Sequence, residues 1–310
     1  MSNNASIIGS NEAPTKLPAD NGRKDLTEQI LHINGVDLCF ETFGKSTDPP
    51  ILLLAGGASS MLFWEEGFCE RLAAEGPRFV VRYDLRDTGR STTYEPGASP
   101  YTLLDLADDA VGLLDALKVT KAHLVGFSLG GGIGQRIALE YPGRVASLIL
   151  ISSSPIGAFV GEPDLPTMSP ENMTKVTNIM PPSWSDRDVV VRFIVEHECL
   201  CGSSLHPFDE ERATARAYRV FDRAANVQSM MNHGPVAFNR WERERLGGIR
   251  TPTLVIHGTD DPVLPYFHGV ALEKEIPDAR LLALEETGHE LPLRVWDVVI
   301  AGILNHTSGS

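Results

Sequence analysis

Short apolar runs alternate with helix-forming segments along most of this chain, and this alternation restricts the possible folds more than any other feature. Residues 51–54 read Ile-Leu-Leu-Leu, an uninterrupted apolar run typical of a strand that is covered on both faces. Similar runs occur at residues 78–83, 122–126, 145–151, 253–257 and 280–284. Helical patterns occupy residues 61–74, 102–117, 129–140, 265–275 and 293–305. The alternation predicts an α/β fold, a mostly parallel sheet flanked by helices.

The beginning of the chain follows a different pattern. Residues 1–26 are rich in Asn, Ser, Gly, Pro and charged side chains, a composition that predicts a flexible N-terminal arm. Residues 28–34 and 36–42 are then separated by Asn34-Gly35, a pair that favours a tight turn. A β-hairpin is therefore expected ahead of the alternating segments. The predicted α/β core consists of residues 27–154 and 247–310.

Residues 155–246 interrupt the alternation, since they show helical patterns and several prolines but no strong strand signal. This stretch holds five of the seven methionines, and flexible thioethers adapt to irregular apolar ligands. We interpret it as a helical cap inserted over a binding site, with Trp184, Met231 and His233 as candidate substrate contacts. The alternative is a helical subdomain that packs only its own core.

Charge and cysteine usage exclude several classes of protein. The formal net charge of −14 argues against nucleic-acid partners, which need clustered cations. Four scattered cysteines are too few for a disulfide framework and lack zinc-site spacing. No signal peptide or membrane span is recognisable, so a cytoplasmic protein without membrane contact is expected. We expect no metal or organic cofactor, and a homodimer or higher homo-oligomer remains open.

The strongest chemical signal is Gly126-Phe127-Ser128-Leu129-Gly130, which follows an apolar run and precedes a helical segment. A serine on such a tight strand-to-helix turn has its hydroxyl exposed above the sheet edge. Gly126 and Gly130 remove side chains that would collide in the turn. Ser128 is therefore the candidate nucleophile.

A serine hydroxyl needs a base, and the base needs an orienting carboxylate. In chains with this serine turn, the acid and then the histidine follow the serine. Asp260 and Asp261 lie just after the run at 253–257, and His289 follows the run at 280–284. All of these positions are at the carboxyl ends of predicted strands, where open α/β sheets bind ligands. His289 is the candidate base, with either aspartate as its partner.

The serine turn, the order of the three groups and the overall layout resemble the α/β-hydrolase superfamily over roughly residues 28–305. The resemblance implies a Gly-x-x-Asp-x-x-x-Pro pattern around the acid, and residues 258–265 match it with Asp261. It also implies an oxyanion hole formed by the backbone amides of Leu129 and Gly57. Many relatives have His-Gly-x before the second donor, whereas this chain has Ala55-Gly56-Gly57, so Gly56 or Ala58 could replace Gly57.

A second loop adds to the resemblance. Residues 82–91 resemble the Asp-x-Arg-Gly-x-Gly-x-Ser loop of these hydrolases, which implies a charge-paired turn that supports the oxyanion loop. Together with Gly56-Gly57, this loop is similar to the aclacinomycin methylesterase-like branch, whose members and neighbours hydrolyse polyketide esters. Bacterial lactonases that act on resorcylic macrolactones such as zearalenone look similar.

The expected function is therefore a serine esterase or lactonase that acts on a bulky, apolar, polyketide-like substrate. Three alternatives remain at this stage: a carbon–carbon bond hydrolase with the same triad, a cofactor-free perhydrolase, and a ligand receptor on the same fold. The sequence does not distinguish a methyl ester from a macrolactone.

Overall fold

A single mixed sheet organises the molecule in a computed structural model, which describes residues 28–157, 164–179, 183–236 and 242–308. Among these residues, eight strands are ordered β1-β2-β4-β3-β5-β6-β7-β8. The strands are β1 (Gln29–Ile33), β2 (Val36–Phe43), β3 (Pro50–Leu54), β4 (Phe79–Tyr83), β5 (Ala122–Phe127), β6 (Val145–Ile151), β7 (Thr253–Gly258) and β8 (Arg280–Leu284). The β1–β2 and β2–β4 pairings are antiparallel and the others are parallel. The structure confirms the predicted α/β fold and hairpin; the predicted arm lies outside the described residues.

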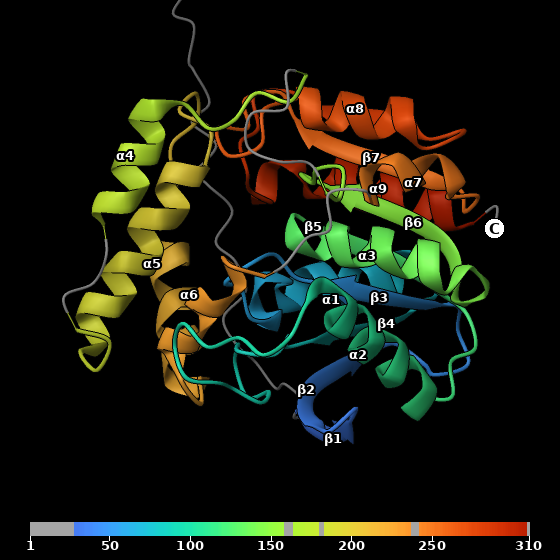
Figure 1. Ribbon diagram of the computed structural model, residues 1–310, viewed down its shortest axis with the longest axis horizontal. Helices are drawn as coiled ribbons and strands as arrows, with labels where there is room; N and C mark the ends of the chain where they lie inside the picture. Colours follow the sequence, from blue (N-terminus) through green and yellow to red (C-terminus); the bar gives the residue numbers. More distant parts are fainter. Residues whose placement is uncertain (1–27, 158–163, 180–182, 237–241, 309–310) are drawn as a thin grey trace, which may run out of the picture.

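Helices cover both faces of the sheet (Figure 1). On one face lie α2 (Leu103–Ala116), α3 (Leu129–Glu140) and α8 (Phe267–Glu275), and on the other lie α1 (Glu66–Glu75) and α9 (Trp296–Thr307). The β3 run divides between them: Leu52 and Leu54 pack in the first core, and Ile51 and Leu53 in the second. This two-residue period explains why the run is apolar throughout.

The helix expected at residues 61–74 is interrupted, which corrects that prediction. A short 3-10 helix, η1 (Met61–Phe63), precedes α1, and the chain leaves helical geometry at Trp64. The carbonyl of Trp64 accepts a hydrogen bond from the buried guanidinium of Arg82, so it does not continue a helical ladder. The predicted C-terminal helix is continuous: a 3-10 turn, η5 (Leu293–Val295), leads directly into α9.

The segment between β6 and β7 contains no strand in its described part. It forms α4 (Pro170–Asn178), α5 (Arg187–Cys201), α6 (Glu210–Arg223), η3 (Val227–His233), α7 (Glu242–Arg245) and η4 (Leu246–Gly248). In Figure 1, α4, α5 and α6 stand beside the α/β core as a separate group. We call α4, α5, α6 and η3 the inserted helices. Two of these helices, α5 and α6, share a small apolar core made by Val191, Val195, Ala213 and Ala217.

The described residues also bear on the cysteines and on membrane spans. All four cysteines are free thiols there, as expected. No described helix is both long and apolar enough to span a membrane.

Candidate active site

Ser128 lies on the turn that joins β5 to α3. Its backbone has φ +52°, in the left-handed region that non-glycine residues rarely adopt. The backbone N–H of Ser128 donates to the carbonyl of Ile151 on the neighbouring β6, at 2.9 Å. This bond holds the strained turn at the carboxyl edge of the sheet, where its side chain lines a cavity. A strained residue at the mouth of a cavity is a common property of functional sites.

The two glycines of the motif are required by close backbone contacts. A Cβ on Gly126 would lie 2.3 Å from the carbonyl oxygen of Gly130, and a Cβ on Gly130 would lie 2.2 Å from that of Leu54. Both distances are far inside van der Waals contact, and in each case the obstacle is backbone. The prediction that these glycines clear space for the serine turn is therefore confirmed.

The structure brings His289 and Asp261 together from the loops after β8 and β7. Their Nδ1 and Oδ2 atoms are 2.8 Å apart. The second oxygen of Asp261 accepts the backbone N–H groups of Val263 and Leu264, at 2.9 and 2.8 Å. Three hydrogen bonds to this buried carboxylate fix its orientation. The bond to Nδ1 leaves Nε2 of His289 available for proton transfer.

The imidazole of His289 also lies beside the serine turn. Its ring centroid is 4.9 Å from that of Phe127, the residue before Ser128. Its backbone N–H donates to the carbonyl of Cys201 at the end of α5, at 2.7 Å. Ser128, Asp261 and His289 all line the same cavity. The three groups expected from the sequence therefore meet at one edge of the sheet.

Asp260, the rival acid, faces a different partner. It accepts a hydrogen bond from Ser203 Oγ, at 2.7 Å, in the loop between α5 and α6. The geometry therefore favours Asp261 as the partner of His289. His257 supports the loop that carries Asp261, because its Nε2 donates to the carbonyl of Leu264 at 2.8 Å. Burial lowers the pKa of His257, which agrees with a structural role for this side chain.

The loop after β3 carries the expected second oxyanion donor. Ala58, one of its alternatives, donates its backbone N–H to Nδ1 of His233, at 3.0 Å, and so is already engaged. Gly57 faces the other expected donor, since a Cβ on it would lie 3.8 Å from the side chain of Leu129. Asp84, in the loop after β4, accepts the backbone N–H of Met61 at 2.8 Å. That loop therefore supports the oxyanion loop, as predicted.

A large cavity of about 1910 Å³ separates the core from the inserted helices. Small-molecule sites are usually about 300–1,000 Å³, so this space admits a ligand of several fused rings. Apolar side chains of the insertion form much of its wall: Met168, Met173, Phe193, Ile194, Met230 and Met231. Of the methionines expected in the cap, Met180 lies outside the described residues.

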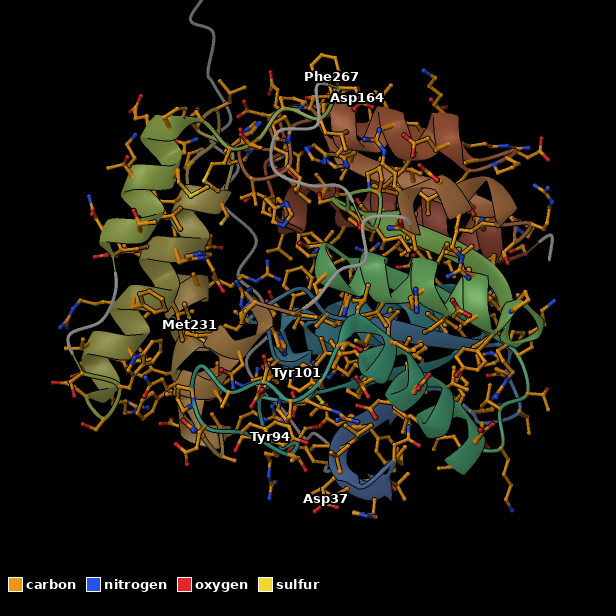
Figure 2. All side chains as sticks on the ribbon, viewed as in Figure 1. Asp37, Tyr94, Tyr101, Asp164, Met231 and Phe267 are labelled. Carbon is orange, nitrogen blue, oxygen red and sulfur yellow. The ribbon has the colours of Figure 1, made fainter. Side chains whose placement is uncertain are left out.

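The three predicted substrate contacts have different outcomes. Met231, which lies on η3 and is labelled in Figure 2, lines the cavity and is 38% exposed. Trp184 does not line the cavity, because it packs edge-on behind Phe193, with ring centroids 5.4 Å apart. His233 lines the cavity but is only 5% exposed, and both of its ring nitrogens are occupied by backbone groups.

Three cavity residues on α5 were not among the candidates from the sequence. His197 lines the cavity together with Phe193 and Cys201. Burial lowers the pKa of His197, and the nearby His289 lowers it further. The four-residue spacing from Phe193 to His197 and on to Cys201 marks a single helix face, a signal that could have indicated these residues.

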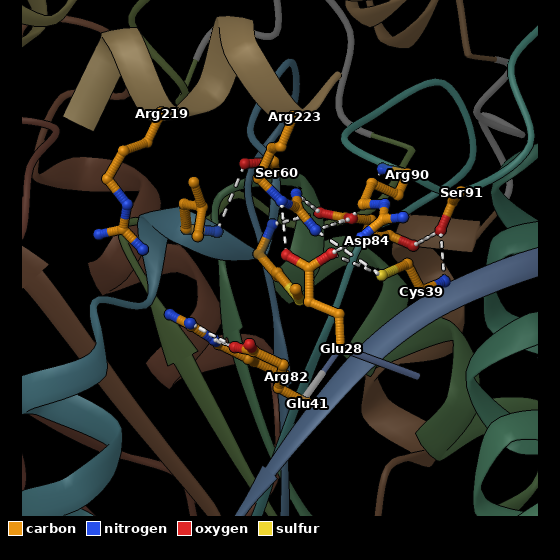
Figure 3. A network of polar contacts seen from close by, with 12 residues as sticks. Glu28, Cys39, Glu41, Ser60, Arg82, Asp84, Arg90, Ser91, Arg219 and Arg223 are labelled. Carbon is orange, nitrogen blue, oxygen red and sulfur yellow. Dashed lines mark hydrogen bonds and ion pairs between the residues drawn. The ribbon is translucent and has the colours of Figure 1, made fainter. Parts of the chain in front are cut away.

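A stripe of arginines on α6 binds the insertion to the core, and Figure 3 labels two of them, Arg219 and Arg223. Arg212 and Arg216 pair with Glu65, at 2.8 and 2.6 Å, and Arg219 pairs with Glu66. Arg223 reaches Asp84 at 2.8 Å and Glu28 at 2.9 Å. The spacing of these arginines places them on one helical face. The stripe therefore sets the position of α6 against the core.

Replacing Arg223 by Met is expected to lower the free energy of unfolding by about 3 kcal/mol, because it leaves the fully buried Asp84 without its main cation. Chemical denaturation measures the change. Arg187→Met is the matched control, since its ion pair with Asp222 joins two side chains that are 46% and 52% exposed. That variant is expected to unfold like the wild type; equal losses in the two variants would contradict the prediction.

Glu66 makes the free energy of unfolding depend on pH. Burial raises its pKa, but hydrogen bonds from Arg219 and Arg82 outweigh burial and hold the pKa at about 2, below the usual 4.5. Such a carboxylate stabilises the fold above its unfolded pKa, and the contribution is lost as the pH falls towards the folded one. Wild type should therefore lose about 3 kcal/mol through this group between about pH 5 and about pH 2.

Glu66→Gln tests this pH dependence. The difference in unfolding free energy between wild type and variant should be large at neutral pH and shrink as the solution is acidified. Glu70→Gln, at an exposed position of the same helix, should show no such change. A difference that stays constant with pH would contradict the assignment.

No group of three His, Cys, Asp or Glu side chains that could hold a metal ion occurs in the described part of the chain.

Comparison with known proteins identifies the family. The sequence profile of the α/β hydrolase fold matches residues 49–293. Rhodomycin D methylesterase DauP from Streptomyces sp. (strain C5) is 36% identical over 285 residues, covering 88% of this chain and 95% of that protein. Rhodomycin D methylesterase DnrP from Streptomyces peucetius is 35% identical with the same coverage. The enol-lactonase structure from Burkholderia xenovorans LB400 shares the fold, with a TM-score of 0.69, 22% identity and coverage of 90% of this chain and 100% of that one.

Proposed function

Since this chain belongs to the α/β hydrolase fold family and is a carboxylic ester hydrolase, we propose that it cleaves its ester through an acyl-enzyme on Ser128. The observation that supports this mechanism most directly is the 2.8 Å contact between Asp261 and His289 beside the strained serine turn. A base already oriented by a buried carboxylate is what a serine nucleophile requires.

The proposed first half-reaction forms the acyl-enzyme. Ser128 Oγ attacks the carbonyl carbon while Nε2 of His289 takes the hydroxyl proton. Asp261 stays ionised and stabilises the imidazolium. The backbone amides of Gly57 and Leu129 bind the oxyanion. As the carbon–oxygen bond to the leaving group breaks, His289 returns the proton to the departing alcohol.

The second half-reaction releases the acid. Water enters, loses a proton to His289 and attacks the acyl carbon, again with the oxyanion held by the two amides. When the bond to Ser128 Oγ breaks, His289 returns the proton to that oxygen. Each cycle therefore consumes one ester and one water, yields one acid and one alcohol, and restores the free enzyme.

For the substrate, we propose an ester or lactone of a bulky, apolar, polyketide-like molecule. The cavity of about 1910 Å³ and its methionine-rich wall suit a flat, multi-ring ligand better than a short acyl chain. The net charge of −14 disfavours polyanionic substrates. Two relatives that this chain matches over 88% of its length are named rhodomycin D methylesterases.

A panel of substrates tests this proposal: a short p-nitrophenyl ester, an anthracycline methyl ester and a resorcylic macrolactone, each followed by release of acid. We expect kcat/KM to be higher for one of the bulky substrates than for the short ester, because only they fill the cavity. Higher kcat/KM for the short ester would contradict the bulky-substrate assignment. Tight binding of every substrate without turnover would instead indicate a ligand receptor.

A further inference from the structure

We infer that His233 is a positioning residue that holds the oxyanion loop in its working shape. The inference rests on the proposed function and adds a residue that the proposed reaction does not use. His233 lies at the end of η3, the last of the inserted helices, and lines the cavity. Its side chain contacts the loop after β3. It would act on the oxyanion through the backbone of that loop and not by touching the substrate.

Both ring nitrogens of His233 have one defined partner. The backbone N–H of Ala58 donates to Nδ1 at 3.0 Å, so Nδ1 carries the lone pair. Nε2 must then carry the hydrogen, which it donates to the carbonyl of Arg86 at 2.7 Å. Burial lowers the pKa of His233, so the ring stays neutral and keeps Nδ1 as an acceptor. The side chain thus works as a fixed bridge between two loops.

The far end of this bridge is firmly held. The guanidinium of Arg86 makes two hydrogen bonds to the carboxylate of Asp109 on α2, at 2.6 and 2.8 Å. The side chain of Asp109 is 1% exposed, and a bidentate pair of this kind has a defined geometry. His233 therefore ties the oxyanion loop to a buried ion pair of the core.

The oxyanion loop, on the Ala58 side of this bridge, is the part that needs support. Gly56 and Gly57 stand in succession before Ala58, and glycine restricts its backbone less than any other residue. Ala58 itself has φ +57°, a left-handed conformation that is unfavourable for alanine. A flexible pair followed by a strained residue needs an external contact to keep one conformation. Because oxyanion stabilisation depends on preorganised donors, a loosened Gly57 amide would raise the barrier to reaction.

Neighbouring residues separate this role from simple packing. Asn232, next to His233, donates to Asp87 Oδ2 at 3.0 Å and so also fastens η3 to the core. Its hydrogen bonds within the described part of the chain go to Asp87, Glu95 and Gly97 and not to the oxyanion loop, and it does not line the cavity. Asn232→Ala therefore loosens η3 while leaving the bond from Ala58 to His233 in place, and it is the matched control.

The test compares His233→Asn, His233→Gln and His233→Ala. The amide oxygen of Asn lies close to the position of Nδ1 and can still accept from Ala58, whereas Gln reaches the position of Nε2 and serves only Arg86. With p-nitrophenyl acetate, we expect His233→Ala and His233→Gln to lower kcat by about ten- to a hundredfold, less than outright loss of a donor. KM should change little. His233→Asn should retain most of kcat, and Asn232→Ala should lower thermal stability with kcat nearly unchanged.

Hydrogen exchange of the Ala58 amide gives a second readout that does not depend on turnover. It should be slow in wild type and His233→Asn and fast in His233→Gln and His233→Ala. Equal kcat in the Asn and Gln variants, or a kcat loss in Asn232→Ala as large as in His233→Ala, would overturn the inference. A wild-type chain that hydrolyses no ester would overturn the proposed function, and with it the catalytic part of this inference, even if the exchange pattern were as expected.

Discussion

Ser128→Ala is expected to lower kcat for the best ester substrate by at least about 10⁴-fold, because removing the nucleophile leaves only the oxyanion donors and binding. The backbone at this position is strained in either residue, and the glycine contacts that shape the turn do not involve the serine hydroxyl. The variant should therefore fold as the wild type does. Steady-state hydrolysis measures the loss, and circular dichroism checks the fold.

Binding separates this prediction from a general loss of the site. The bulky ester should bind Ser128→Ala with about the wild-type Kd, because the cavity wall is untouched. A fluorophosphonate, which forms a covalent bond to an activated serine, should label the wild type at Ser128 and leave the variant unlabelled by mass spectrometry. Retained turnover, or labelling of the variant at another serine, would refute the proposed nucleophile.

Asp261→Asn is expected to lower kcat by about 10⁴-fold, because an amide facing Nδ1 of His289 would favour the wrong tautomer and would not stabilise the imidazolium. The two backbone N–H groups that donate to Asp261 Oδ1 can still donate to the side-chain oxygen of the asparagine. The geometry of the acid loop should thus survive while the charge is lost. The measurement is kcat at a pH where the wild type is fully active.

Asp260→Asn supplies the matched comparison in the same loop. It removes the same charge one residue away, but its partner is Ser203 Oγ and not His289. We expect a decrease in kcat of less than about tenfold, since only the link to the α5–α6 loop is weakened. A large loss in Asp260→Asn together with near-normal activity in Asp261→Asn would mean that the acid has been assigned to the wrong residue.

Much of the α/β core could be predicted from local patterns. The helix at 129–140 begins and ends where the apolar period and the serine turn place it. Thr102 and Asp105 form the capping box that begins α2, one residue inside the predicted range. The break at Trp64 was missed because Arg82, which binds the Trp64 carbonyl, lies in β4. Local periodicity cannot report a hydrogen bond from a residue that is distant in sequence.

The candidate site divides in the same way. Ser128 and His289 follow from motif and chain order, because a tight strand-to-helix turn and a strand-end loop are local features. The cavity wall does not follow so directly. Trp184 was expected to contact substrate because it is a large aromatic residue in the insertion, yet it packs behind Phe193. Composition indicates which segment forms a wall, but the rotation of each helix decides which side chains face the cavity.

The order of apolar runs, the serine turn and the two strand-end loops were enough to specify the α/β fold and to nominate Ser128, Asp261 and His289. These are short-range signals, in which steric demand and hydrophobic period act within a few residues. The family pattern pointed to Asp261 rather than Asp260, and the tertiary structure added a physical distinction, because Asp261 contacts His289 whereas Asp260 contacts Ser203. The tertiary structure also turned His233 from a candidate substrate contact into a bridge between Ala58 and Arg86, since hydrogen-bond partners more than 140 residues away leave no local trace.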